Sequence, residues 1–173
     1  YMKKTTLAAL CGGVLLFTSC AHEFNQVYKS QDYDFKYEYA KEAFALGKYQ
    51  RAITLLTELV TIEKGTNKGE ESLYMLAMAE YASKDYESAS ETFKKYYSSY
   101  PRGVYAEMAS FYIGQSLYMS TPEPRLDQTQ TVTAIAAFQD YLDLFPDAKL
   151  KGTAQKRLFE LQDKLVKKEL LSA

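Results

Sequence analysis

The sequence has little of the material from which catalytic and metal sites are built. Its 173 residues include one histidine, two cysteines and no tryptophan. These leave almost nothing for a transition-metal site, and no glycine-rich phosphate loop or serine in a nucleophile elbow is present. A formal charge of −1 also lacks the basic excess of a nucleic-acid binder. The composition therefore predicts a protein that is not an enzyme, binds no cofactor, metal or nucleic acid, and works through its surface.

Proline and glycine are also scarce, with four and eight residues. Because these residues interrupt helices, their scarcity leaves room for long ones. With 47% hydrophobic and 25% charged residues, the chain belongs among ordered soluble domains. Sixteen tyrosines and nine phenylalanines indicate that aromatic rings do much of the packing.

The N-terminal twenty residues are typical of a secretory signal peptide. Two lysines precede the apolar run 7–17, and small residues follow before Cys20. The run is too short to span a bilayer of about 30 Å. The cysteine after small residues resembles a bacterial lipobox, although Phe17 stands where an aliphatic residue is usual. We predict a lipoprotein signal peptide over 1–19 and, on Cys20, a diacylglycerol and an N-acyl chain such as palmitate. The alternative is an ordinary signal peptide cut elsewhere, which leaves Cys20 a free thiol. Residues 20–32, with the only histidine, His22, are interpreted as the acylated N-terminus and a tether.

The rest of the chain repeats itself. Segment 70–101 matches the chain 37 residues earlier, and its first half matches the chain 37 residues later. Its second half matches the third copy only at a shift of 45, which locates an insertion at 121–130. Ala89 and Phe93 recur as Ala134 and Phe138, the Ala-x₃-Phe spacing of tetratricopeptide repeats. We predict an all-α domain over 33–173, in which tetratricopeptide-like antiparallel helical hairpins stack into a short right-handed solenoid. The repeats are expected at about 33–66, 70–103 and 104–147, with a partial repeat or capping helix at 149–170.

The first helices of such hairpins line the concave face, so their recurring positions are the candidate binding residues. They form a trough of aromatic and methionine side chains with scattered polar groups, which suits an extended peptide. The alternative is that part of this set packs between repeats. Acidic pairs such as Glu70 and Glu71 are expected to be solvated. The predicted trough comprises Tyr37, Lys41, Phe44, Tyr74, Met78, Tyr81, Phe111, Gln115 and Tyr118, flanked by Met108 and Met119.

The lipobox, the tether, the spacing from Tyr37 to Ala52 and the Tyr100-Pro101 and Phe145-Pro146 endings together resemble the BamD family. These are tetratricopeptide lipoproteins of the outer-membrane β-barrel assembly machine. The insertion carries Arg125 and Asp127, and the family has an Arg/Asp pair in a loop at that point. Family members usually continue for two further repeats, so the chain resembles their N-terminal three-fifths.

The resemblance implies a scaffold anchored to the outer membrane by its lipid, on the periplasmic face. It implies binding of C-terminal segments of unfolded barrel proteins by the N-terminal repeats, and it adds Arg125 and Asp127 to the trough as candidate peptide- or partner-binding residues. It further implies contacts with a BamA-like barrel subunit and with other lipoproteins of the machine. The alternative function is that of a lipid-anchored carbohydrate-binding surface protein, because stacked tyrosines also hold sugar rings. The lack of tryptophan disfavours that alternative.

Overall fold

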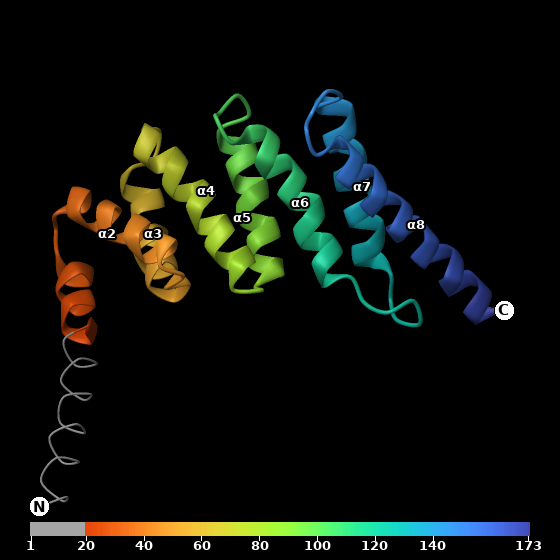
Figure 1. Ribbon diagram of the computed structural model, residues 1–173, viewed down its shortest axis with the longest axis horizontal. Coiled ribbons are helices and arrows are strands. Elements are labelled where there is room, and N and C mark those ends of the chain that lie inside the picture. Colours follow the sequence, from red (N-terminus) through yellow and green to blue (C-terminus); the bar gives the residue numbers. More distant parts are fainter. Residues whose placement is uncertain (1–19) are drawn as a thin grey trace, which may run out of the picture.

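The computed structural model describes residues 20–173, and the predicted signal peptide lies outside them. All regular structure in these residues is helical, and consecutive helices pack against each other in a row (Figure 1). No helix in 20–173 has the length and apolar character needed to cross a bilayer. The named helices are α2 (Tyr33–Ala45), α3 (Tyr49–Ile62), α4 (Asn67–Ala82), α5 (Tyr86–Ser99), α6 (Ala106–Ser120), α7 (Thr129–Leu144) and α8 (Lys151–Ser172).

The helices pair into three hairpins, α2/α3, α4/α5 and α6/α7, followed by α8, which confirms the predicted tetratricopeptide-like fold. Each hairpin has a hydrophobic cluster of its own. Residues at matching repeat positions form the centres of these clusters, because the hairpins repeat the same packing. Fully buried examples at one such position are Ala52, Ala89 and Ala134.

A second recurring position must be small because two helices approach closely there. Ala40 and Ala77 are completely buried at this position. Gly114 occupies it in the third repeat, where an added Cβ would lie 2.9 Å from the ring of Phe138. The small residues therefore allow the two helices of each hairpin to pack closely.

The hairpin turns recur as well. Gly47 between α2 and α3 has φ 74°, and Lys84 between α4 and α5 has φ 65°. Thirty-seven residues beyond Lys84 lies Thr121, where the chain turns extended (ψ 137°) and the insertion begins. The insertion thus replaces the left-handed turn of the third hairpin with the irregular segment 121–128.

The segment interpreted as a tether differs from an open linker, because residues 20–29 are helical. Val27 is buried in the cluster of the first hairpin, with only 1% of its surface exposed. The ring of Phe24 lies 6.2 Å from that of Tyr39, and the guanidinium of Arg51 lies 5.4 Å from the Phe24 ring centroid. Phe24, Val27 and Tyr28 have the spacing of one helix face, which explains why the segment docks.

The start of the second repeat also differs from the repeat expectation. Helix α4 begins at Asn67, ahead of the predicted start of the second repeat, because the side chain of Thr66 accepts from the Gly69 amide. Gly69 lies inside the helix, where a Cβ would collide with the Glu63 carbonyl. Helix α8 buries Ala154 and Leu161 against the third hairpin, as a capping helix would.

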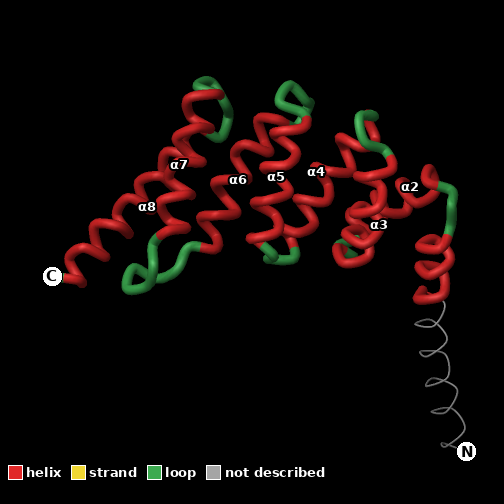
Figure 2. The backbone as a smooth tube through the Cα atoms, turned by 180° about the vertical axis from the view of Figure 1, so that it is seen from behind, coloured by secondary structure: helices red, strands yellow, loops and turns green. Residues whose placement is uncertain are grey.

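Figure 2 shows the same row from behind, with the connections as loops along its two edges. The turns within hairpins and the insertion lie along one edge. The connections between successive hairpins lie along the other.

Candidate functional site

A hollow of about 180 Å³ lies between the first helices of the first two hairpins. It brings together Phe44 from α2 with Tyr74 and Met78 from α4, three of the residues predicted from the sequence. Met75, Glu71 and Tyr105 complete its lining. The surface inside is therefore mostly aromatic and thioether, with one carboxylate at the wall. We call this set of six residues the aromatic hollow.

The ring of Tyr74 has a fixed position in the wall. It stacks on Tyr105 with ring centroids 4.3 Å apart and planes 5° apart, and it meets the edges of Phe93 and Tyr96. Burial raises the pKa of Tyr74 to about 12, so its hydroxyl stays neutral at physiological pH. The hollow thus has a preformed wall, which reduces the entropy lost when a ligand binds.

A buried hydrogen-bond chain positions Tyr105. The Tyr96 hydroxyl donates to Glu70 Oε1 at 2.6 Å and accepts from the Tyr105 amide at 3.0 Å. The Val104 amide also donates to Glu70 Oε1, at 2.9 Å. Burial and the Glu70 hydrogen bond raise the pKa of Tyr96. These hydrogen bonds fix the start of α6, which has no side-chain N-cap of its own.

The other acidic residue, Glu71, organises the polar end of the hollow. It accepts from the Tyr37 hydroxyl, and Lys41 Nζ lies 3.8 Å from its Oε1 and 5.1 Å from the Tyr37 ring centroid. Burial, together with Glu71, raises the pKa of Tyr37. The expectation that Glu70 and Glu71 are merely solvated was wrong, because both carboxylates join helices that are distant in sequence.

The predicted trough does not continue evenly into the third repeat. Phe111 is only 4% exposed, and Gln115 is buried with Nε2 donating to the Tyr81 hydroxyl at 3.4 Å. Helix α8 covers Tyr118, whose hydroxyl donates to Glu160 Oε2 at 2.6 Å beneath Arg157. The hydrogen bond from the Tyr118 hydroxyl lowers the pKa of Glu160.

The remaining trough positions differ in exposure. Tyr81 meets the rings of Tyr86 and Tyr112 edge-on and is partly buried. Met108 is half-buried and Met119 is exposed. In the first two hairpins Tyr37 was wrongly predicted to be open, since it is only 4% exposed, whereas Lys41, Phe44, Tyr74, Met78 and Tyr81 are partly exposed.

In the insertion, Arg125 and Asp127 are both exposed and do not pair with each other. Asp127 instead accepts from the Thr129 amide at 3.3 Å, where α7 starts. The segment is organised by Gln128, which sequence reasoning missed. Its amide donates to the Glu123 and Leu126 carbonyls and accepts from the Thr131 hydroxyl.

Two lysines hold the insertion to α8. Lys164 Nζ donates to the Thr121 hydroxyl at 2.6 Å, and Lys168 Nζ donates to the Leu126 carbonyl at 2.7 Å. Burial lowers the pKa of Lys164. The loop is therefore a structured part of the C-terminal end.

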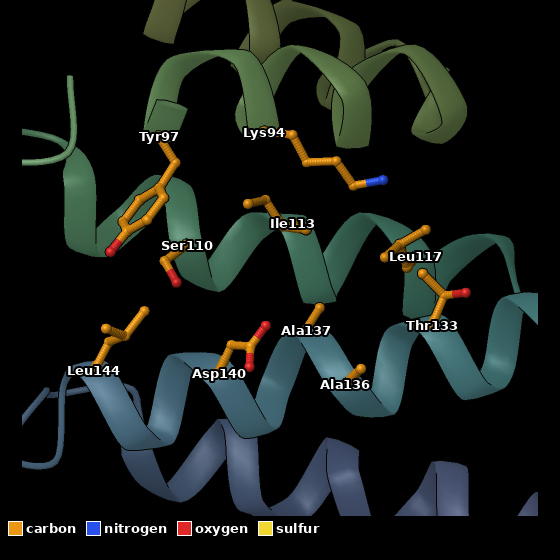
Figure 3. Close-up of a pocket in the computed structure, with 10 residues that line it drawn as sticks. All are labelled: Lys94, Tyr97, Ser110, Ile113, Leu117, Thr133, Ala136, Ala137, Asp140 and Leu144. Carbon is orange, nitrogen blue, oxygen red and sulfur yellow. The ribbon is translucent and has the colours of Figure 1, made fainter. Parts of the chain in front are cut away.

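A second hollow, of about 270 Å³, lies where α5 and α7 flank α6 (Figure 3). Its floor carries Ser110, Ile113 and Leu117 from α6, while Lys94 and Asp140 extend from the flanking helices. The sequence did not single it out, because its residues come from three helices without a shared repeat position. Residues 20–173 contain no group of three potential metal ligands.

Stacked helical hairpins define a tetratricopeptide-like helical repeat protein, with an aromatic hollow between its first two repeats. The model of one protein family, YfiO, described as an outer membrane lipoprotein, matches residues 29–173. The chain therefore belongs to the YfiO family of outer-membrane lipoproteins, which is the BamD family resembled by its sequence. No match was found among curated proteins.

Proposed function

We propose that this chain is a non-enzymatic scaffold for the assembly of outer-membrane β-barrel proteins. In this proposal it binds the C-terminal segments of unfolded barrel proteins in the aromatic hollow. The single observation that supports it most is that hollow, formed by Phe44, Tyr74 and Met78 in a member of an outer-membrane lipoprotein family.

The size and lining of the hollow suit an aromatic side chain. An apolar cavity of about 150 Å³ accepts benzene, so a hollow of about 180 Å³ has room for one phenyl ring. Full burial of a phenylalanine side chain contributes roughly 1.5–3 kcal/mol. Lys41 is 40% exposed beside Glu71 and can pair with the terminal carboxylate of the same peptide. Both features favour a segment that ends in phenylalanine.

The proposed partners and location rest on the family resemblance and not on a contact in this structure. The scaffold would carry acyl chains on Cys20, stand on the periplasmic face of the outer membrane, and contact a BamA-like subunit and other lipoproteins. The fatty-acid content of the purified protein tests the anchor. A Cys20→Ser variant should lose the fatty acids and leave the membrane fraction. Retention of the variant in washed membranes would exclude this anchor.

The carbohydrate alternative receives less support from the geometry. A sugar ring stacks on a free aromatic face, but one face of Tyr74 is covered by Tyr105. A glycan array provides the direct comparison.

Peptide binding tests the proposal. The probe is a synthetic twelve-residue peptide of alternating apolar and polar residues with a C-terminal phenylalanine, followed by fluorescence anisotropy. We expect saturable binding that weakens when the terminal carboxylate is amidated and nearly disappears when the phenylalanine is moved inside the sequence. Equal affinity for the rearranged peptide would refute recognition of the C-terminal aromatic residue.

A matched pair of variants locates the binding site. Met78→Glu places a carboxylate inside the hollow and should weaken binding at least about tenfold, because a buried unpaired charge is costly. Met119→Glu adds the same charge at an exposed methionine outside the hollow and should leave binding unchanged. Equal losses in both variants would remove the hollow from the proposal.

A further inference from the structure

The helix over residues 20–29 is fixed against the first hairpin. Val27 is buried with Leu55 and Leu59 in one cluster, and Phe24 is held between Tyr39 and Arg51. A helix docked along one face in this way has little freedom to swing relative to the solenoid. The docked helix therefore limits how far residue 20 can lie from the folded repeats.

Docking also brings the start of this helix close to the α2–α3 turn. Glu23 lines one small hollow together with Tyr39, Leu46 and Lys48. Cys20 precedes Glu23 by three residues, or about 4.5 Å along a helix. Cys20 is exposed at this end. The start of the helix is thus about one turn beyond a residue that meets the α2–α3 turn.

That turn is part of a continuous edge of the molecule. The α2–α3 turn, the α4–α5 turn and the insertion lie on the side of the row at which the helix over residues 20–29 begins (Figures 1 and 2). The connections α3–α4, α5–α6 and α7–α8 lie on the opposite side in both views. We call residues 46–48, 83–85 and 121–128 the turn edge.

We propose that the turn edge faces the lipid bilayer, so that the solenoid lies edge-on along the membrane. This inference rests on acylation of Cys20, as in the proposed function. Acyl chains on Cys20 must enter the bilayer where that residue lies, and the docked helix transmits this position to the first hairpin. The rigid packing of successive hairpins then carries the orientation to the insertion.

The anchor, and not surface charge, would set this orientation. The turn edge exposes the basic residues Lys48, Lys84 and Arg125. It also exposes the acidic residues Asp85, Glu123 and Asp127. Because the charges balance, the edge has no net attraction for anionic headgroups, and its orientation should persist at high salt and on zwitterionic lipid.

The test uses the lipidated protein reconstituted in phosphatidylcholine vesicles. Acylation blocks Cys20, so single cysteines introduced elsewhere can carry a fluorophore. Leu46→Cys and Leu126→Cys place it on the turn edge, and Arg102→Cys and Asp147→Cys place it on exposed sites of the opposite edge. A lipid with a spin-labelled headgroup then quenches only nearby labels.

We expect at least twofold stronger quenching at Leu46→Cys and Leu126→Cys than at the two control sites. Equal quenching at all four sites, or quenching at Leu46→Cys alone, would overturn the edge-on orientation. Flotation of the vesicles is measured in parallel. Protein that does not float shows that the anchor itself fails, whereas protein that floats without the quenching difference refutes only the orientation.

A second variant tests the role of the docked helix. Val27→Asp should release the helix from the first hairpin and bring quenching at Leu46→Cys down to the control value, while flotation and helical circular dichroism persist. Asn25→Asp adds the same charge on the exposed side of this helix and should change nothing. An unchanged quenching pattern in Val27→Asp would show that the helix does not set the orientation.

Discussion

The Tyr96→Phe substitution removes a single hydroxyl group, but it should destabilise the protein far more than the loss of one small group would suggest. Tyr96 is completely buried, and its hydroxyl joins Glu70 to the Tyr105 amide. Hydrogen bonds to charged groups contribute about 1.5–3 kcal/mol, and an orphaned buried amide costs about 1–3 kcal/mol. Because Glu70 keeps its bond to Val104, we expect a total loss of about 2–4 kcal/mol.

The third repeat supplies a matched control. Tyr141 lies at the equivalent position, is also completely buried, and has a hydroxyl without a hydrogen-bond partner of normal geometry. The Tyr141 hydroxyl has no carboxylate partner and only a weak contact with the Leu150 backbone, so Tyr141→Phe should have an effect from neutral to a loss of about 1 kcal/mol. The same chemical change at matching positions is therefore expected to have different consequences.

Urea unfolding followed by circular dichroism measures both variants. The slope of the transition shows whether they still unfold as the parent does, since repeat arrays can lose cooperativity. The free energy of unfolding should fall much more in Tyr96→Phe than in Tyr141→Phe. This variant should also bind the phenylalanine-terminated peptide more weakly, because Tyr105 forms a wall of the aromatic hollow. Equal destabilisation by the two variants would refute the role assigned to the Glu70–Tyr96–Tyr105 chain.

Three further outcomes follow from the structure. Lys84→Gly should raise the urea midpoint by the equivalent of about 0.5–1 kcal/mol, because Lys84 has φ 65°, a left-handed conformation that glycine adopts without strain. A lower midpoint would contradict this expectation. Burial raises the folded-state pKa of several tyrosines above 10.0, that of Tyr74 to about 12, so neutral phenols favour the folded state. This stabilisation is complete below about pH 10 and lost as the pH rises toward 12, so the tyrosinate absorbance of the buried tyrosines should appear together with loss of helical signal. Complete ionisation of the tyrosines while the helical signal persists would contradict the assigned burial. Gln128→Ala should speed tryptic cleavage after Arg125 without loss of helix, because Gln128 holds the insertion through two carbonyl groups. Gln130→Ala, at an exposed residue, should leave the cleavage rate unchanged. Equal cleavage rates in the two variants would show that Gln128 does not hold the insertion.

Self-similarity predicted most of the fold because hairpins that repeat the same packing reuse the same residue sizes. Ala40, Ala77 and Gly114 coincide at a shift of 37 and all lie at close helix contacts. The offset of the third copy located the insertion correctly, since the helices on both sides of it keep their register. Capping and turn residues in the sequence then predicted most helix ends to within a few residues of their positions in the structure.

The candidate site was less predictable, because a shared repeat position does not show what covers it. Tyr74 and Phe111 occupy the same position, yet Tyr74 lines a hollow while Phe111 is enclosed by Phe138 and Tyr141. The bond between Glu70 and Tyr96 was invisible for another reason. It joins side chains 26 residues apart, and nothing in the local pattern distinguishes Glu70 from a solvated helix residue.

Hydrogen exchange with the phenylalanine-terminated peptide tests the central claim most directly. Binding in the aromatic hollow should slow amide exchange in the C-terminal half of α2 and in α4, which provide Phe44, Tyr74 and Met78. Exchange in α8 should not change, and the rearranged peptide should protect neither region. Protection confined to other helices, or equal protection by both peptides, would contradict the account.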